Sequence, residues 1–140
     1  MRLYELEHEP TTFPVNWKVP RRMELYLDKG IEKVVWVDVD KVDEKWKLDR
    51  NFHVGPSGTG SAIAGRYQRF EEWMKDGQPV EMSEMGLGYR DLPSFTNGRH
   101  RFAWMRDHGA KAIPVITPVE EANRFEEKFG SNLRKTIITA

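Results

Sequence analysis

The sequence contains no cysteine among its 140 residues. A disulfide scaffold, a thiolate zinc site, an iron–sulfur cluster and a cysteine nucleophile are therefore excluded. It also lacks an apolar run of the length that crosses a bilayer, about 18 residues or more. Acidic residues interrupt the first eight positions, which therefore do not resemble the apolar core of a signal peptide. We expect a cytoplasmic protein that does not insert into a membrane.

Neither sign of charge is in excess, because 22 Lys and Arg residues balance 22 Asp and Glu residues. This balance argues against a polycationic nucleic-acid binder but not against a local charged patch. Between residues 45 and 69, five basic residues stand against one acidic residue, which favours a local anionic ligand over a merely solvated surface. The four histidines lack metal-ligand spacing, so we expect no structural metal.

Short apolar segments separated by turn residues predict an α+β fold, with a small mixed β-sheet and three main helices. The expected strands are residues 33–38, 79–85, 90–96 and 112–116, with the turn between the middle pair at residues 86–88. The expected helices are residues 61–75, 98–108 and 118–129. Apolar spacing assigns a buried face to the first helix and to the last: Ile63, Tyr67, Phe70 and Met74 in one, Val119, Ala122, Phe125 and Phe129 in the other.

The N-terminal region, residues 1–32, differs in composition from residues 33–140, although we expect both to belong to one compact domain. Three prolines before residue 22 predict an extended arm. Residues 23–27 are predicted to form a strand that pairs, through a turn at residues 28–30, with the strand that follows. Asp40 is expected to cap a short helix that ends at Trp46.

A glycine-rich loop, Gly55-Pro-Ser-Gly-Thr-Gly-Ser61, has the glycine spacing of a P-loop. Ser61 stands where a P-loop requires lysine, so a true P-loop nucleotide-hydrolase site is not expected. Gly58, Gly60 and Ser61 could still bring backbone amides to an anion at the start of the predicted helix. A flexible surface loop is the alternative.

A second glycine turn precedes the helix of residues 98–108. Gly98 frees the turn, and Arg99, His100 and Arg101 then stand at the start of the helix, where the first amides are unpaired. A phosphate would meet guanidinium, imidazole and amide donors in one place. A solvated helix end is the alternative, but cations there oppose the helix dipole. We therefore expect an anion site.

Three segments resemble the superfamily of the ParB N-terminal domain and sulfiredoxin over about residues 33–130: Trp36-Val-Asp-Val-Asp-Lys-Val42, Arg66 to Met74, and Phe95-Thr-Asn-Gly-Arg-His-Arg101 followed by Ala110 to Val115. The resemblance implies that the helix and the turn bind nucleotide phosphates, with His100 and Arg101 holding phosphate and Arg66 matching a basic residue of the nucleotide-binding helix. Arg99 replaces the sulfiredoxin cysteine, which excludes sulfinic-acid reduction. The second arginine pair and the helix-turn-helix domain of ParB are missing, which argues against partition-complex assembly.

A narrower resemblance is to the plasmid fertility inhibition factor family, carried by residues 54–60, 66–67, 79–82 and 94–109. Some members of that family are linked to ATP hydrolysis, DNA cleavage and suppression of conjugative DNA transfer. The resemblance implies a protein that binds ATP or another nucleotide with Mg²⁺, acts as an ATPase or DNase, and has DNA as a partner. His100 is the candidate catalytic residue, and no general base is identified. The alternative is a non-catalytic protein that binds a component of a DNA-transfer machine.

Overall fold

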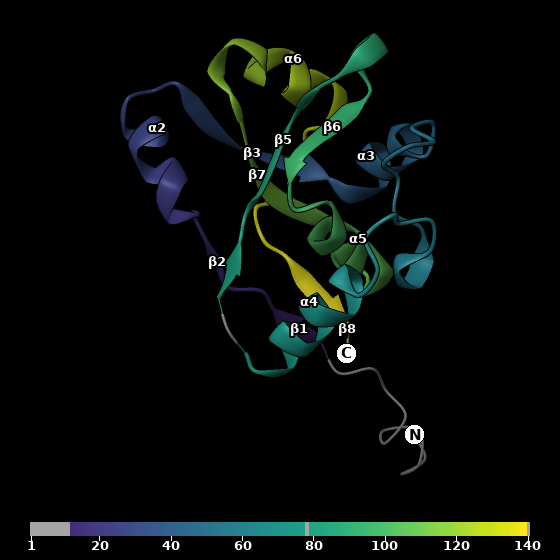
Figure 1. Cartoon of the computed structure of the whole chain (residues 1–140). Coiled ribbons are helices and arrows are strands. Elements are labelled where there is room, and N and C mark those ends of the chain that lie inside the picture. The colour runs from purple at the N-terminus through teal and green to yellow at the C-terminus, as the bar shows by residue number, and fades with distance from the viewer. Residues whose placement is uncertain (1–11, 78, 140) are drawn as a thin grey trace, which may run out of the picture.

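The computed structural model describes residues 12–77 and 79–139, which form a mixed α+β fold (Figure 1). Its central sheet has four strands in the order β3-β7-β5-β6. These are β3 (Glu32–Asp38), β7 (Ala112–Pro118), β5 (Ser83–Leu87) and β6 (Pro93–Asn97). β7 runs antiparallel to β3 and parallel to β5, and β5 runs antiparallel to β6. The predicted fold class is confirmed.

In the described part of the chain, five α-helices surround this sheet: α2 (Glu24–Asp28), α3 (Val39–Trp46), α4 (Arg66–Lys75), α5 (Arg99–Asp107) and α6 (Val119–Phe129). α4 and α5 pack against each other in the lower part of Figure 1, and α6 packs against β3, β5 and β7 in the upper part. The buried core includes Val35 and Val37 of β3, Trp46 of α3, Phe102 of α5 and Phe125 of α6. Each of these side chains is fully enclosed, so the core links α3, α5 and α6 to the sheet.

Two short ribbons hold the N-terminal arm against the rest of the chain. β1 (Thr12–Pro14) pairs antiparallel with β8 (Ile137–Thr139), and β2 (Trp17–Lys18) pairs parallel with β4 (Val80–Glu81). The indole Nε1 of Trp17 donates a hydrogen bond to Thr136 Oγ1 at 2.9 Å. The extended conformation predicted for the arm is therefore present at residues 12–18, while residues 1–11 lie outside the described part of the chain.

The predicted strand at residues 23–27 is wrong, because the chain there forms α2 after a 3₁₀ turn at Arg21–Met23. Leucine and glutamate are good helix formers, and a five-residue run of this kind does not distinguish a strand from a helix. β3 pairs with β7 along its whole length, so β7, and not residues 23–27, is its strand partner. The helix cap was also misassigned: the Asp38 carboxylate, and not that of Asp40, accepts the Lys41 N–H at 3.1 Å.

Two other boundaries differ from the predictions. α4 begins at Arg66, and not at residue 61, because Gly65 adopts a left-handed conformation with φ of 80° directly before it. Ile63 therefore precedes the helix and is 43% exposed, whereas Tyr67 and Phe70 are buried as predicted. The turn between β5 and β6 lies at residues 88–92, and not at residues 86–88. In α6, Val119 is exposed, while the other three predicted positions are buried.

Candidate functional site

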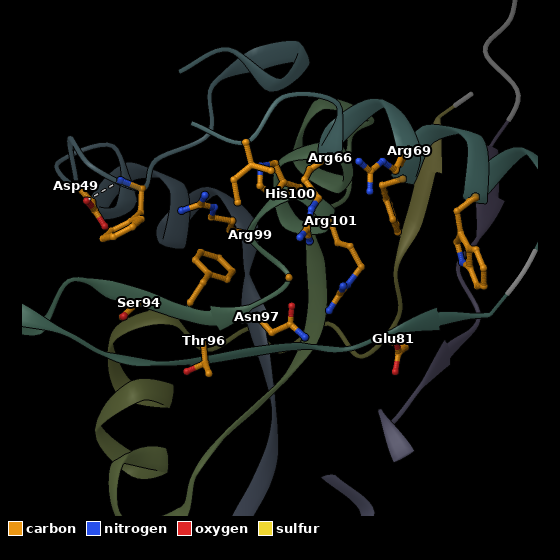
Figure 2. A pocket seen from close by; sticks show the side chains of 16 residues that line it. Asp49, Arg66, Arg69, Glu81, Ser94, Thr96, Asn97, Arg99, His100 and Arg101 are labelled. Atoms are coloured by element: carbon orange, nitrogen blue, oxygen red, sulfur yellow. Dashed lines mark hydrogen bonds between the residues drawn. The ribbon is translucent and has the colours of Figure 1, made fainter. Parts of the chain in front are cut away.

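A cavity of about 660 Å³ lies between α4, the start of α5 and the edge strand β6 (Figure 2). Four arginines line it: Arg66 and Arg69 from α4, and Arg99 and Arg101 from α5. Gly98 and His100 line it as well. The two segments singled out by the sequence for phosphate binding, at residue 66 and at residues 98–101, therefore share one cavity.

The arginines of this cavity are not neutralised by acidic side chains. Across residues 12–77 and 79–139, none of the four forms an ion pair. The acidic residues of the cavity wall are Asp49 and Glu81, which lie at opposite ends (Figure 2). Asp49 Oδ1 already accepts the backbone N–H groups of residues 51 and 52. The cavity therefore carries an excess of positive charge on a chain whose net charge is zero.

The N-terminus of α5 opens into the same cavity. Gly98 precedes it with φ of 89°, and no side chain from residues 12–77 or 79–139 caps the helix. The first turn of a helix leaves its N–H groups without intrahelical partners, and the first helical bond here is from Phe102 N to Gly98 O. A Cβ at residue 98 would clash with Ser83 Oγ and lie 2.7 Å from Arg101 Nη2, so only glycine fits. The turn thus brings free amides and guanidinium groups together.

Arg101 is the one of the four arginines with a buried side-chain nitrogen that has no hydrogen-bond partner among the described residues. Its Nε is buried and has no hydrogen-bond partner in the described part of the chain, and its Nη2 lies 3.5 Å from the carbonyl oxygen of Met82. Burial lowers the pKa of Arg101, although Glu81 and Glu84 act in the opposite direction. The guanidinium stays charged in proteins, and it extends into the space between α5 and β6 (Figure 2).

The buried carboxylate near Arg101 is engaged elsewhere. Glu84, on β5, forms an ion pair with Arg22 from the N-terminal arm. Asn97 Nδ2 lies 3.5 Å from the same carboxylate. The Arg22–Glu84 pair, which the sequence analysis missed, leaves Arg101 without a directly bonded anion. A pair of residues 62 positions apart gives no local signal in one sequence.

His100 is buried and lies within hydrogen-bond distance of the glycine-rich loop: its Nε2 is 2.6 Å from Ser61 Oγ. Burial, together with the charges of Arg99 and Arg66, lowers the pKa of His100 from 6.5 to about 4. The imidazole is therefore neutral at pH 7, and its Nε2 is occupied by Ser61. It cannot contribute a positive charge to the cavity, unlike the arginines on either side of it.

The glycine-rich loop itself does not line the cavity. Gly58 and Gly60 are not part of the cavity wall. Residues 56–58 pack against α5, where Ser57 N donates to Asp107 Oδ2 at 2.9 Å, and a Cβ at Gly58 would lie 2.8 Å from Tyr67 Cβ. Because α4 begins only at Arg66, the loop does not supply the amides of that helix terminus. Of the loop residues proposed from sequence, Ser61 forms a hydrogen bond with a cavity residue, His100.

A network of charged side chains, which the sequence analysis also missed, fixes this loop to the helices. Arg106 of α5 donates to Asp43 Oδ1 at 2.9 Å, to the carbonyl oxygen of Val54 at 2.7 Å and to Asp107 Oδ1 at 3.0 Å. Tyr67 of α4 donates to Asp107 Oδ2 at 2.6 Å. Although burial acts to raise the pKa of Asp43, hydrogen bonds from His53 and Arg106 hold it below its ordinary value. The network therefore sets the position of α4 relative to α5, and with it the width of the cavity.

Neither a metal-binding cluster nor a membrane span occurs in the part of the chain that the structure describes. No group of three or more His, Asp or Glu residues there is arranged to hold a metal ion. None of the helices there has the length and apolar character needed to cross a bilayer.

The comparisons with known proteins give one match. No curated protein and no solved structure matches the chain. The family model described as plasmid fertility inhibition factor matches residues 34–130, which include every residue of the cavity wall. The match starts in β3, extends just beyond α6 and covers more than half of the chain. The chain therefore belongs to the plasmid fertility inhibition factor family.

Proposed function

We propose that the basic cavity binds the phosphate groups of a nucleotide or of DNA, and that the protein acts through this site in the cytoplasm to inhibit conjugative DNA transfer. One observation carries the proposal: four arginines without ion pairs in the described chain surround a helix N-terminus that no side chain caps. Such an arrangement is unfavourable without an anion, because cations beside a helix N-terminus are repelled by the helix dipole and by one another.

The proposed roles follow from the position of each residue. Arg101 and the first amides of α5 bind one phosphate, because forked guanidinium donors and backbone N–H groups both match phosphate oxygens. Arg66 and Arg99 bind the adjacent phosphate. His100 acts as a neutral group that connects Ser61 to the helix, and Gly58 and Gly60 allow the loop to pack closely. Family membership is consistent with a role in inhibiting plasmid transfer.

ATP with Mg²⁺ fits the donor set of the cavity. Mg²⁺ is usually held by one or two carboxylates together with substrate phosphates. Asp49 and Glu81 are the carboxylates of the cavity wall, so the phosphates would provide most of its ligands. The ion would neutralise charge on the polyphosphate, while the arginines orient it. In this proposal the site is of the kind found in the ParB and sulfiredoxin superfamily.

Isothermal titration calorimetry with ATP and CTP, with and without Mg²⁺, tests the binding step. We expect saturable binding that Arg101→Ala weakens and that Arg134→Ala leaves unchanged. Arg134 is the matched control, because it is exposed, lies outside the cavity and has no ion pair in the described chain. If neither nucleotide nor a DNA oligonucleotide binds, or if both variants weaken binding equally, the proposal is wrong.

A second candidate function is binding without turnover, in which the cavity recognises a component of a DNA-transfer machine. It is favoured by the state of His100, which is uncharged and held by Ser61, and by the engagement of Asp49 with loop amides. The first candidate allows hydrolysis of the bound nucleotide or DNA, and the second excludes it, so phosphate release and plasmid nicking distinguish the two. Catalysis is supported if the wild-type protein releases more phosphate or nicks more plasmid than the double variant His100→Ala, Arg101→Ala. Equal background from both would leave only the binding function.

A further inference from the structure

A second cavity, of about 740 Å³, lies between α3, α6 and the tip of the β5–β6 hairpin. It shares no residue with the basic cavity. Its wall combines apolar side chains, among them Leu48, Leu92 and Phe129, with charged ones from all three elements. The hairpin tip that forms one side of it projects beyond α6 at the top of Figure 1.

The hairpin tip presents an aromatic side chain to solvent. Tyr89 is 80% exposed, and the guanidinium of Arg90 lies 5.2 Å from the centre of its ring. Arg90 and Asp91 both have left-handed backbones, with φ of 55° and 60°. Residues with a Cβ adopt this conformation at a cost, and glycine or asparagine is the usual choice in such turns. Ion pairs from Asp91 to Arg124 and Lys128 of α6 stabilise the tip in this form.

The charges around this cavity are unbalanced. Its wall carries the cations Lys41, Lys45, Arg90 and Lys128 against two acids, Glu44 and Asp91. Asp91 is already paired with α6, whereas Lys41, Lys45 and Arg90 form no ion pair with any residue in 12–77 or 79–139. The two lysines are four positions apart on α3 and so project from one face, where like charges repel each other. The cavity therefore combines apolar side chains with an excess of positive charge.

We propose that this cavity binds an acidic peptide segment of a partner protein, with one apolar side chain of that segment between Leu48 and Tyr89 and its carboxylates on Lys41, Lys45 and Arg90. An exposed tyrosine beside other apolar side chains is typical of protein interfaces. A polyphosphate fits less well, because Glu44 and Asp91 are also in the wall. The proposal does not depend on the phosphate site, since the two cavities are separate.

The test uses the full chain and a panel of short synthetic acidic peptides, each with Trp, Tyr, Phe or Leu at one position among Glu and Asp residues. Fluorescence anisotropy measures affinity, and amide chemical shifts of the labelled protein locate the contact. We expect saturable binding, with shifts confined to α3, α6 and residues 88–92. The same peptides with Gln and Asn in place of the acids should bind about tenfold more weakly, since charged hydrogen bonds are lost.

Variants separate the site from general electrostatic attraction. Lys41→Gln with Lys45→Gln, and separately Tyr89→Ala, should each reduce affinity about tenfold or more. The matched control is Lys29→Gln with Lys33→Gln, which removes the same charge from exposed positions outside the cavity. Retained chemical shifts elsewhere in each variant show that it is folded. The proposal is overturned if no peptide of the panel binds, if the control loses as much affinity, or if the same residues respond to an oligonucleotide and not to the peptides.

Discussion

Replacing Arg101 by methionine should have opposite effects on folding and on binding. In the described chain the buried Nε of Arg101 has no partner, and its side chain makes one hydrogen bond, from Nη2 to the carbonyl oxygen of Met82 at 3.5 Å. An unsatisfied buried donor costs about 1–3 kcal/mol. Attraction by Glu81 and Glu84 offsets part of this cost. Methionine keeps most of the side-chain volume and has no donor, so we expect the free energy of unfolding to rise by about 1 kcal/mol.

For a domain of this size, that gain corresponds to a melting temperature about 3 °C higher. Binding of ATP or of an oligonucleotide should weaken by about 1.5–3 kcal/mol, the range for hydrogen bonds to charged groups, which is about 10- to 150-fold in Kd. Arg101→Lys should restore part of the affinity, because it keeps the charge and loses the fork. Scanning calorimetry of the apo protein and titration calorimetry with ligand measure the two effects. A lower melting temperature in Arg101→Met would show that Arg101 is a structural residue, and the phosphate-site reasoning would fail.

Other predictions concern the surroundings of the site. Arg106→Met should lower the free energy of unfolding by about 3 kcal/mol in denaturant titrations, because the carboxylates of Asp43 and Asp107 lose their buried partner. A change as small as that caused by replacing a surface arginine would contradict a structural role for this network. Because the folded-state pKa of His100 is about 4 against 6.5 for an ordinary histidine, the unfolded state binds more protons between these values. The free energy of unfolding should therefore fall as pH falls through this window, by about 2 kcal/mol near pH 5. His100→Gln should remove this contribution to the pH dependence of stability. Gly98→Ala should destabilise the protein by about 2 kcal/mol or more, since the alanine Cβ would clash with Ser83 and φ at this position is 89°. An unchanged melting temperature would show that no such clash occurs. The logarithm of the association constant for an oligonucleotide should fall linearly with the logarithm of salt concentration, and more steeply than that for ATP.

The parts of the fold that could be predicted depend on local signals. The strand near residues 33–38 and the helix from residue 99 follow from an apolar run and from a glycine that precedes a helix. The cluster of Arg99, His100 and Arg101 was recognisable for the same reason, because three neighbours on one helix start necessarily lie together. The shared cavity with Arg66 could be expected from the superfamily resemblance, which implies that the helix containing Arg66 and the turn at Gly98 both bind nucleotide phosphates.

The remaining features depend on contacts between distant segments. The pairing of Arg106 with Asp43 joins residues 63 positions apart, and a single sequence does not specify which of several acids such an arginine meets. The neutral state of His100 depends on its burial, which only the packed structure determines. The helix at residues 24–28 was missed because five residues are too few to show a period. The position of the glycine-rich loop, away from the cavity, reflects its anchoring by Asp107 and could not be read from its P-loop-like spacing.

The β1–β8 ribbon has a consequence for how the chain could be rearranged. Thr12 and Thr139 are register partners in this ribbon, so the two ends of the described chain meet across one strand pair. A short glycine-rich linker could therefore join them, with new ends opened at the exposed residues 50–52. Such a circular permutant would keep every strand pairing of the sheet and the second cavity, because ends that already lie side by side need no rearrangement to be connected. It would also let a sensor or a fusion partner be inserted beside Phe52, at the rim of the arginine cavity.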